Sequence, residues 1–295
     1  MKLVAPNYYP LFQCKAGACR HSCCIGWEID IDDASLARFR SVPGELGQRL
    51  QEKIDWENRC FRLDEKERCP FLTDSGLCQL ILSLGESSLC QICTDHPRFR
   101  NFLPGRTEIG LGLCCEAAAQ LVLTQTEPMR LLTLQDDGTS EEPSAFLTFR
   151  DRLFALAQDR TRSIDQRIQD IQAACGISLV VDAPHWASLL LTLERLDPQW
   201  EVCLRRLLEP PRPAPGWDIP LEQLLCYLMY RHLPGALEDG DVQGRVTYCC
   251  LMVQLLRHML RDDLPELARM YSSEIEYSDE NLDALLEEVD SLLFP

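Results

Sequence analysis

The chain has 295 residues, 46% of them hydrophobic, and a formal net charge of −17. This composition is sufficient for a hydrophobic core of normal size and argues against a disordered chain. The acidic balance argues against binding to nucleic-acid phosphates or anionic lipid and favours basic protein surfaces as partners, although acidity also serves solubility alone.

The N-terminal region, to about residue 125, is predicted to consist of short helices joined by irregular loops. One short helix is expected at 32–40 with Asp32 or Asp33 as its cap, and another at 76–85 ending at Gly85. A third is expected at 114–125, which is rich in good helix formers. Short strands are expected at 27–31, where the pattern alternates, and at 60–64.

A polar segment at 133–145 is typical of a surface linker, and nearly everything after it has a helical pattern. Ser163 and Gln166 have the spacing of a capping box, and Pro198 follows the capping residue Asp197 in the first turn of its helix. The expected helices lie within 144–160, 163–176, 183–196, 197–210, 219–233, 242–260 and 278–293.

These elements predict a mainly α fold in which an irregular cysteine-rich region with short helices is packed on a C-terminal helical bundle. The predicted domains are a metal-binding region at 1–132 and a helical domain at 146–295. The apolar stretch near the N-terminus is too short for a secretory signal. The longest apolar segments, 221–230 and 246–260, are interrupted by polar residues, so neither offers the ~20 apolar residues of a membrane span. We therefore expect a cytoplasmic protein with no membrane or nucleic-acid partner.

Eleven of the sixteen cysteines lie between Cys14 and Cys115. Thiols stay reduced in the cytosol, which argues against a disulfide framework and leaves a metal site or redox chemistry. The later cysteines occupy apolar helical patterns and are expected to be small buried hydrophobic residues. They are Cys175, Cys203, Cys226, Cys249 and Cys250.

The spacing of the early cysteines does not by itself identify a metal. Zinc knuckles need C-x2-C pairs, and Cys90 and Cys93 alone have that spacing, whereas iron–sulfur clusters accept wider intervals. Four cysteines hold one cluster, so eight or more allow a second metal. Gly26 stands where the C-x3-C-x2-C loop of radical S-adenosylmethionine enzymes needs a cysteine, so that chemistry is not predicted. Alternatively, a metal could have a purely structural role and stabilise a loop-rich region.

The histidines add little. His96 follows Cys93 closely enough to be a ligand or a proton carrier, although local hydrogen bonding in a loop is the simpler interpretation. His21 also lies among the cysteines. The remaining three, His185, His232 and His258, fall on helical segments and need no special role.

Several stretches together resemble the flagellin lysine-N-methylase family. They are the cysteine run before "GWEIDID", "CPFL…GLCQLILSLGE", "C…HPR", "EIGLGLCCEAA", the segment 221–233 and the tail 270–287. The N-terminal half of that family carries a cysteine-rich module shared with zinc- or iron-chelating proteins. This chain departs from many members in a compact middle between residues 135 and 215.

The resemblance implies transfer of a methyl group from S-adenosylmethionine to surface lysines of flagellin, with an iron–sulfur cluster, 4Fe–4S in type, as prosthetic group and zinc as the alternative metal. Cys90 and Cys114 correspond to additional cysteines beside the shared ones. The metal-binding set that it implies is Cys14, Cys19, Cys23, Cys24, Cys69, Cys78, Cys93 and Cys115.

Methyl transfer to lysine needs a neutral amine held in line with the sulfonium carbon. The tail offers aromatic and acidic groups for this, and we predict Tyr271, Glu274, Glu276 and Tyr277 as catalytic candidates. After Arg269 there are eight acidic residues and no basic one, which suits a lysine-bearing substrate. The alternative is a solvated amphipathic helix, which is the preferred interpretation of Asp283, Glu287, Glu288 and Asp290.

No glycine-rich dinucleotide loop follows a predicted strand, since "GLGL" at 110–113 is too short, and the S-adenosylmethionine pocket is not located. Three hypotheses therefore stand. The leading one is a protein-lysine methyltransferase with a cysteine-ligated metal. The second is a zinc- or iron-chelating binding protein without methyl transfer. The third is a redox protein that uses the adjacent thiols Cys23 and Cys24, or Cys114 and Cys115.

Overall fold

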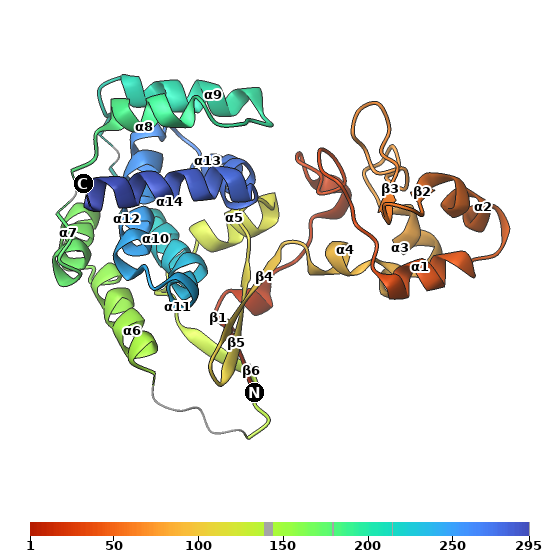
Figure 1. The fold of residues 1–295 in the computed structure, drawn as a ribbon, viewed down its shortest axis with the longest axis horizontal. Helices are drawn as coiled ribbons and strands as arrows, with labels where there is room; N and C mark the ends of the chain where they lie inside the picture. The colour runs from red at the N-terminus through yellow and green to blue at the C-terminus, as the bar shows by residue number, and fades with distance from the viewer. Residues whose placement is uncertain (139–143, 179, 214, 295) are drawn as a thin grey trace. The chain divides into compact units, whose positions relative to one another are not determined.

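The computed structural model describes residues 1–138, 144–178, 180–213 and 215–294. The chain divides into two compact units (Figure 1). Unit 1 comprises Met1–Phe12, Phe99–Cys114 and Ala118–Pro295, and unit 2 comprises Gln13–Arg98 and Cys115–Ala117. Neither unit is continuous in sequence, so the boundaries between the units differ from those of the predicted domains. The domains 1–132 and 146–295 stay a prediction.

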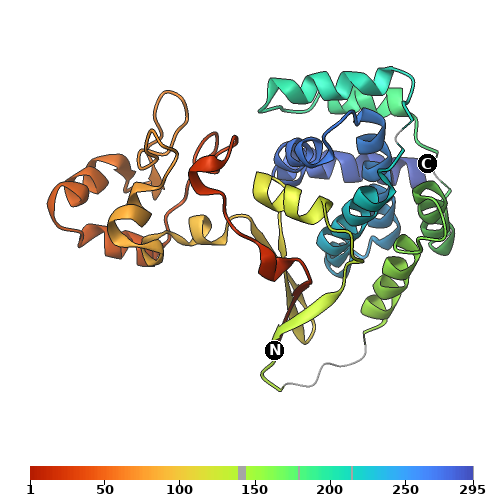
Figure 2. The same ribbon diagram turned by 180° about the vertical axis from the view of Figure 1, so that it is seen from behind.

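Unit 1 is built mainly of helices, and the predicted mainly α fold is confirmed. Its central helices are α10 (Asp218–His232) and α12 (Val242–Met259), which lie side by side with α14 (Asp279–Leu293) against α12 (Figures 1 and 2). Both central helices are buried nearly all round, as expected for helices inside a core rather than on its surface. The others are α5 (Glu116–Leu123, which begins in unit 2), α6 (Ala145–Ala157), α7 (Ile164–Ala174), α8 (Ala183–Leu190), α9 (Pro198–Arg205), α11 (Ala236–Asp239) and α13 (Leu264–Tyr271).

The helices begin where the sequence places capping residues. Ser163 and Gln166 form the predicted capping box of α7, and Asp197 caps α9 with Pro198 in the first turn. In unit 2, Asp32 caps α1 (Asp33–Arg40) and Gly85 follows the last residue of α3 (Gln79–Leu84). These signals are local. A capping side chain accepts a hydrogen bond from a backbone N–H in its own turn, and glycine permits the backbone angles at a helix end.

A four-stranded sheet in the order β4-β5-β1-β6 was not predicted from the sequence. β1 runs parallel to β5 and antiparallel to β6, with a register shift between Leu3 and Val4. Its strands are β1 (Lys2–Pro6), β4 (Arg98–Leu103), β5 (Arg106–Leu111) and β6 (Leu131–Gln135), so β6 takes the beginning of the expected linker 133–145. Residues 139–143 of that segment lie outside the described residues.

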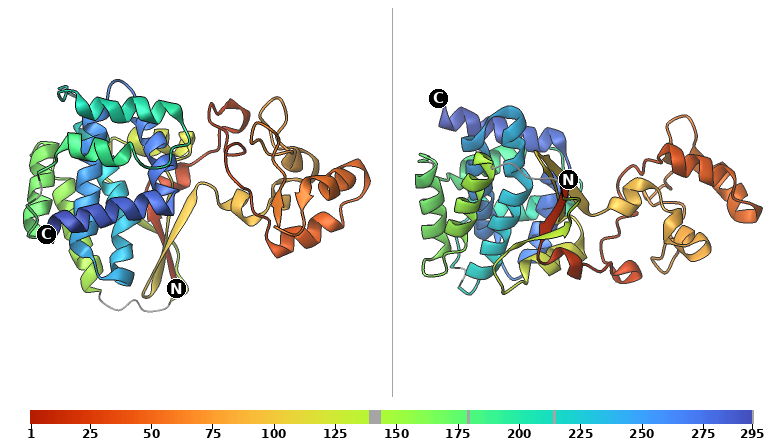
Figure 3. Two further views of the ribbon diagram at one scale, coloured as in Figure 1. Left: turned by 45° about the horizontal axis from the view of Figure 1, so that its top comes forward. Right: turned by 90° about the horizontal axis from the view of Figure 1, so that it is seen from below.

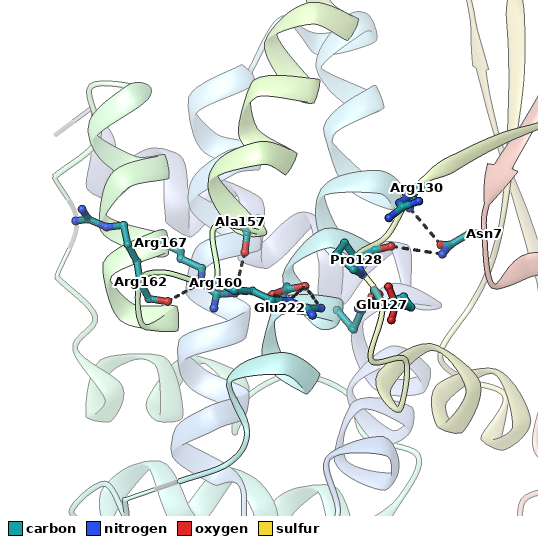
Figure 4. Close-up of polar contacts among 10 residues, drawn as sticks. Asn7, Glu127, Pro128, Arg130, Ala157, Arg160, Arg162, Arg167 and Glu222 are labelled. Atoms are coloured by element: carbon teal, nitrogen blue, oxygen red, sulfur yellow. Dashed lines mark hydrogen bonds and ion pairs between the residues drawn. The ribbon is translucent and has the colours of Figure 1, made fainter.

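Buried ion pairs fasten the helices of unit 1 to one another and to the sheet. On α10, the fully buried Glu222 accepts hydrogen bonds from Arg167 at 2.6 Å and from Arg160 at 2.8 Å (Figure 4). On β5, Glu108 is bound by both terminal nitrogens of Arg150 on α6, at 2.6 and 2.7 Å. Such bidentate pairs fix geometry as well as charge.

Unit 2 is smaller and has short elements joined by long loops, with α1 and α2 coloured red-orange in Figure 3. Ile29, Phe39, Phe61 and Phe71 form the centre of its core, on which Cys69 and Cys90 also pack. Its elements are α1 (Asp33–Arg40), α2 (Gly44–Lys53), β2 (Ile54–Asp55), β3 (Cys60–Phe61), α3 (Gln79–Leu84) and α4 (Gln91–Asp95).

Two predicted strands of unit 2 are shorter than expected. The segment 60–64 contributes the two residues of β3, and the segment 27–31 contributes only a single bridge from Asp30 to Cys60. Among the helices of the described residues, none combines the length and the apolar character that a bilayer crossing requires.

One acidic contact between α14 and the start of α12 gives a prediction about stability. Asp290 faces Asp241, whose side chain accepts the Gly244 N–H at 2.7 Å, and Asp239 and Arg245 lie nearby. Burial, and then the charge of Asp241, raise the pKa of Asp290 above its ordinary 3.8. The ionised form of Asp290 is therefore disfavoured in the folded state. The contribution of this carboxyl to the free energy of unfolding falls as pH rises above 3.8.

Replacement Asp290→Asn is expected to raise the free energy of unfolding at pH 7 by about 0.5–2 kcal/mol. The gain should shrink as pH falls toward 3.8, where the wild-type carboxyl takes up its own proton. Chemical denaturation of both proteins at pH 7 and pH 4 measures it, with the exposed Asp283→Asn as control. An equal gain at both pH values would contradict the acid-pair explanation.

Candidate functional site

The thiols of unit 2 occupy two places. At the first, Cys14 and Cys19 flank a short 3-10 turn, Ala16–Ala18, and the Ala16 N–H donates to the Cys14 sulfur at 3.3 Å. Burial, and then the negative charges of Cys115 and Cys14, raise the pKa of Cys19 to about 11. These three cysteines therefore lie near one another although Cys115 is far away in the sequence.

Glu116 holds this loop beside Cys115. Its carboxylate, 8% exposed, accepts hydrogen bonds from Lys15 Nζ at 2.8 Å and from the Arg20 backbone N–H at 2.9 Å. Although burial opposes it, these bonds lower the pKa of Glu116 to about 2. Both ends of the loop that carries Cys14 and Cys19 are thus tied to the residue that follows Cys115.

Replacement Glu116→Ala is expected to free this loop. Loss of a charge-assisted hydrogen bond, about 1.5–3 kcal/mol, should make the half-buried Cys19 react about tenfold faster with an alkylating reagent, whereas Cys14 is already exposed. Mass spectrometry measures the rates, with Cys69 as internal reference and the exposed Glu65→Ala as control variant. An unchanged rate at Cys19 would show that Glu116 does not order the loop.

The second place lies against the core of unit 2. The Cys69 N–H donates to the Cys24 carbonyl at 2.8 Å, and Leu72 pairs with Cys78 in an isolated bridge. The sulfurs of Cys90 and Cys93 lie 3.4 Å apart. Burial, and then the charges of Cys78 and Cys90, raise the pKa of Cys69 to about 11. Cys24, Cys78 and Cys93 also pack on the core, so these five cysteines belong to one neighbourhood.

The donor chemistry at both places fits a thiophilic metal, because soft thiolates select zinc and iron–sulfur clusters. The separation of Cys90 and Cys93 is close to the roughly 3.8 Å that follows for two sulfurs on one zinc at about 2.3 Å. The placement does not complete a ligand set, since within the described residues no three His, Cys, Asp or Glu side chains surround a common point for a metal ion. The eight metal-binding cysteines remain a prediction.

The other cysteines and His96 differ from these groups. Cys60 is buried beside acidic residues, Glu28, Asp55 and Asp30, rather than beside thiols. All sixteen cysteines are free thiols, and of the later five, Cys203, Cys226, Cys249 and Cys250 are buried while Cys175 is half-buried. Burial, and then Arg98, lower the pKa of His96 to about 4, and its ring lies 6.2 Å from that of Trp27. His96 is therefore neutral near pH 7.

The tail candidates lie around a π-helical turn, Ser272–Glu276, between α13 and α14 in unit 1. Such turns widen a helix and often occur at functional sites. The fully buried Tyr271 places its hydroxyl 2.5 Å from that of Tyr248. Glu274 faces elsewhere and accepts the backbone N–H groups of Leu196 and Asp197, at 2.9 and 2.7 Å, just before α9.

Glu276 is the centre of a buried polar network. It accepts hydrogen bonds from the Tyr227 hydroxyl and from His232 Nε2, both at 2.7 Å, and Arg231 Nε lies 3.5 Å from its carboxylate. Burial opposes ionisation, but Arg231 and then His232 lower the pKa of Glu276 to about 2. Burial lowers the pKa of His232, so the imidazole is neutral and donates its Nε2 proton to the carboxylate.

Tyr277 is the accessible member of the four. The residue is 48% exposed. The Arg231 guanidinium lies 4.7 Å from the centre of the Tyr277 ring and 4.8 Å from the centre of the Phe99 ring. The Tyr277 hydroxyl fills the space above Gly112, where a Cβ would approach it to 2.2 Å. The structure therefore brings Tyr271, Glu276 and Tyr277 into one region and leaves Glu274 as a support for α9.

Sequence analysis did not find the residues that organise this region. Tyr227, Arg231 and His232 lie on α10 and Tyr248 on α12, in segments that were predicted only as apolar helices. Polar groups at 223, 227 and 231, four positions apart on one side of α10, were the available signal, since polar side chains in a buried helix need partners.

The fold and these groups define a mainly α protein with a thiol-rich unit. The chain is 23% identical over 134 residues to a protein named Lysine-N-methylase from Salmonella typhimurium, covering 43% of this chain and 33% of that protein. The protein of that name from Salmonella choleraesuis gives the same values. Flagellar biosynthetic protein FliU of Salmonella muenchen is 22% identical over 134 residues, covering 43% of this chain and 79% of FliU.

The matched stretch thus spans about a third of the length of the curated lysine-N-methylases. No family model matches the chain, and no solved structure matches it. The similarity is distant, and it agrees with the family that the cysteine run and the tail resemble.

Proposed function

We propose that this chain is a protein-lysine N-methyltransferase that moves the methyl group of S-adenosylmethionine to surface lysines of flagellin. The observation that supports this is the similarity over 134 residues to proteins named Lysine-N-methylase and FliU. A cysteine-ligated iron–sulfur centre of the 4Fe–4S type in unit 2, and a cytoplasmic location, are parts of the same proposal. The formal charge of −17 suits a substrate that presents lysines.

The reaction needs a neutral ε-amine whose lone pair attacks the methyl carbon of the sulfonium. The C–N bond forms as the C–S bond breaks, S-adenosylhomocysteine leaves as a neutral thioether, and the new ammonium releases a proton to solvent. In unit 1, Tyr277 is the candidate that a substrate can touch, because its side chain is half-exposed whereas Tyr271 and Glu276 are buried. Glu276 acts through Arg231, whose guanidinium packs on the Tyr277 ring.

The test uses labelled S-adenosylmethionine, purified flagellin and the anaerobically purified full chain. Label is expected on flagellin lysines, identified by mass spectrometry. Tyr277→Phe is expected to lower kcat by about 10²-fold, because its hydroxyl relays the proton of the new ammonium to solvent. Glu287→Gln, an exposed change on α14, should leave kcat unchanged. Absence of label with metal-loaded wild-type protein would refute the methyltransferase proposal.

A second candidate is a zinc- or iron-chelating binding protein without methyl transfer. The observation that favours it is that Glu274 and Glu276 are both occupied by internal partners, while the thiols of unit 2 have the chemistry of metal ligands. Metal binding by a chain that fails to label flagellin would support this candidate. A brown anaerobic preparation indicates iron–sulfur, and a colourless one indicates zinc.

A further inference from the structure

The segment 110–113, which is too short for a dinucleotide loop, contains two glycines that are covered by aromatic rings. A Cβ at Gly110 would lie 2.3 Å from Phe99 Cζ, and a Cβ at Gly112 would lie 2.2 Å from the Tyr277 hydroxyl oxygen. Both distances are below the 3.0 Å that Cβ atoms keep from other heavy atoms. Neither glycine has a positive φ, so the close approach of a ring, and not a left-handed backbone, requires glycine here.

The two rings share a partner in Arg231. Its guanidinium lies 4.7 Å from the centre of the Tyr277 ring and 4.8 Å from the centre of the Phe99 ring. The Tyr277 hydroxyl is hydrogen-bonded to the side chains of Arg231 and Cys114. The hydroxyl is thus bounded by the backbone of Gly112 and by two polar side chains.

The backbone of Tyr277 is fixed by other contacts. Its N–H donates to the Ser272 carbonyl at 3.1 Å, at the end of the π-helical turn Ser272–Glu276. Tyr277 is therefore held at its backbone by this turn and at its ring by Gly112 and Arg231. With the backbone fixed, a Cβ on Gly112 is accommodated by rotation of the tyrosine side chain. That rotation moves the hydroxyl most, because it is the atom farthest from the backbone.

We propose that Gly112 is a positioning residue for methyl transfer, because its lack of a side chain lets the Tyr277 hydroxyl lie against the chain at the place where it meets the substrate amine. This inference rests on the proposed function, in which that hydroxyl relays the proton of the new ammonium. A proton relay needs heavy atoms about 2.6–3.2 Å apart. An added Cβ would move the hydroxyl by about 1 Å, and a misplacement of this size can cost up to about 10²-fold in rate.

The kinetic test compares Gly112→Ala in two backgrounds. In the otherwise wild-type chain it is expected to lower kcat for flagellin by about 10-fold or more and to leave KM unchanged, since the hydroxyl and not substrate binding is affected. In the Tyr277→Phe background it should cause no further loss, because the atom that the Cβ displaces is absent. An equal loss in both backgrounds would overturn the proposal, since Gly112 would then act on something other than the hydroxyl.

Nitration of Tyr277 by tetranitromethane tests the same contact without methyl transfer. Burial, and then the charge of Cys114, raise the pKa of Tyr277. A hydroxyl displaced into water loses this effect, and each unit by which the pKa falls gives about ten times more of the reactive phenolate. Gly112→Ala is therefore expected to speed nitration of Tyr277, measured by mass spectrometry, by about tenfold. An unchanged rate in the folded variant would overturn the proposal.

Gly47→Ala is the matched control for nitration. A Cβ there would lie 1.9 Å from the Val42 carbonyl oxygen, so the site is equally tight, but it belongs to unit 2 and should leave the Tyr277 rate unchanged. Should Gly112→Ala not fold, Gly112→Ala combined with Tyr277→Phe is expected to fold, and failure of both would overturn the proposal. Nitration needs no flagellin, so it distinguishes a wrong role for Gly112 from a wrong methyltransferase proposal.

Discussion

Replacement Glu276→Ala is expected to destabilise unit 1 by about 3–5 kcal/mol, because it leaves a buried cation without its carboxylate. The Arg231 guanidinium contacts the rings of both Phe99 and Tyr277, and its side chain is mostly shielded from water. Tyr227 and His232 would lose their hydrogen-bond acceptor in the same change. Chemical denaturation followed by circular dichroism measures the loss.

The pH dependence separates charge from packing in this network. Glu276 has an ordinary pKa of 4.5 and a folded pKa of about 2, so its contribution to stability is present above pH 4.5 and is lost as pH falls toward 2. The isosteric Glu276→Gln should therefore be destabilised most above pH 5, with a cost that shrinks in acid. Glu287→Gln on the exposed face of α14 is the control. A pH-independent cost would mean that packing, not charge, sets the effect.

Replacement Glu222→Ala is also expected to lower the free energy of unfolding, by about 3–5 kcal/mol, since it leaves Arg167 buried and unpaired. Arg167 is 2% exposed and also donates to the carbonyls of Ala157 and Arg162 (Figure 4). Because α10, α7 and the end of α6 meet at this carboxylate, the loss should appear in the global unfolding of unit 1, which thermal denaturation measures.

The second arginine provides the control for Glu222. The Arg160 side chain is 33% exposed, so Arg160→Ala should cost about 1 kcal/mol or less. In a double-mutant cycle, Glu222→Ala combined with Arg167→Met should be less destabilised than the sum of the single changes, because no unpaired buried charge remains. Additive effects would contradict the buried-pair explanation.

The cysteine-rich region and the tail differ in how far the sequence predicts them. The cysteine types and their concentration before residue 116 predict thiol chemistry, since no other function needs them there. Their placement depends on the hydrogen bond from the Arg20 N–H to Glu116 and on the pairing of Cys24 with Cys69, which join positions 96 and 45 residues apart. In the tail, composition indicated acidic and aromatic groups but not that Glu274 supports α9 while Glu276 binds α10.

By itself the sequence determined the mainly α class and the starts and ends of many helices. Caps such as Asp32, Ser163 and Asp197 act within one turn, and so their effect can be read without knowing the rest of the chain. Only the tertiary structure decided that β1 pairs with β5 and β6, more than a hundred residues away, and which partners the buried charges of Glu222 and Glu276 find. These contacts join segments that are remote in sequence, and their free energy depends on burial that arises only when the segments pack together.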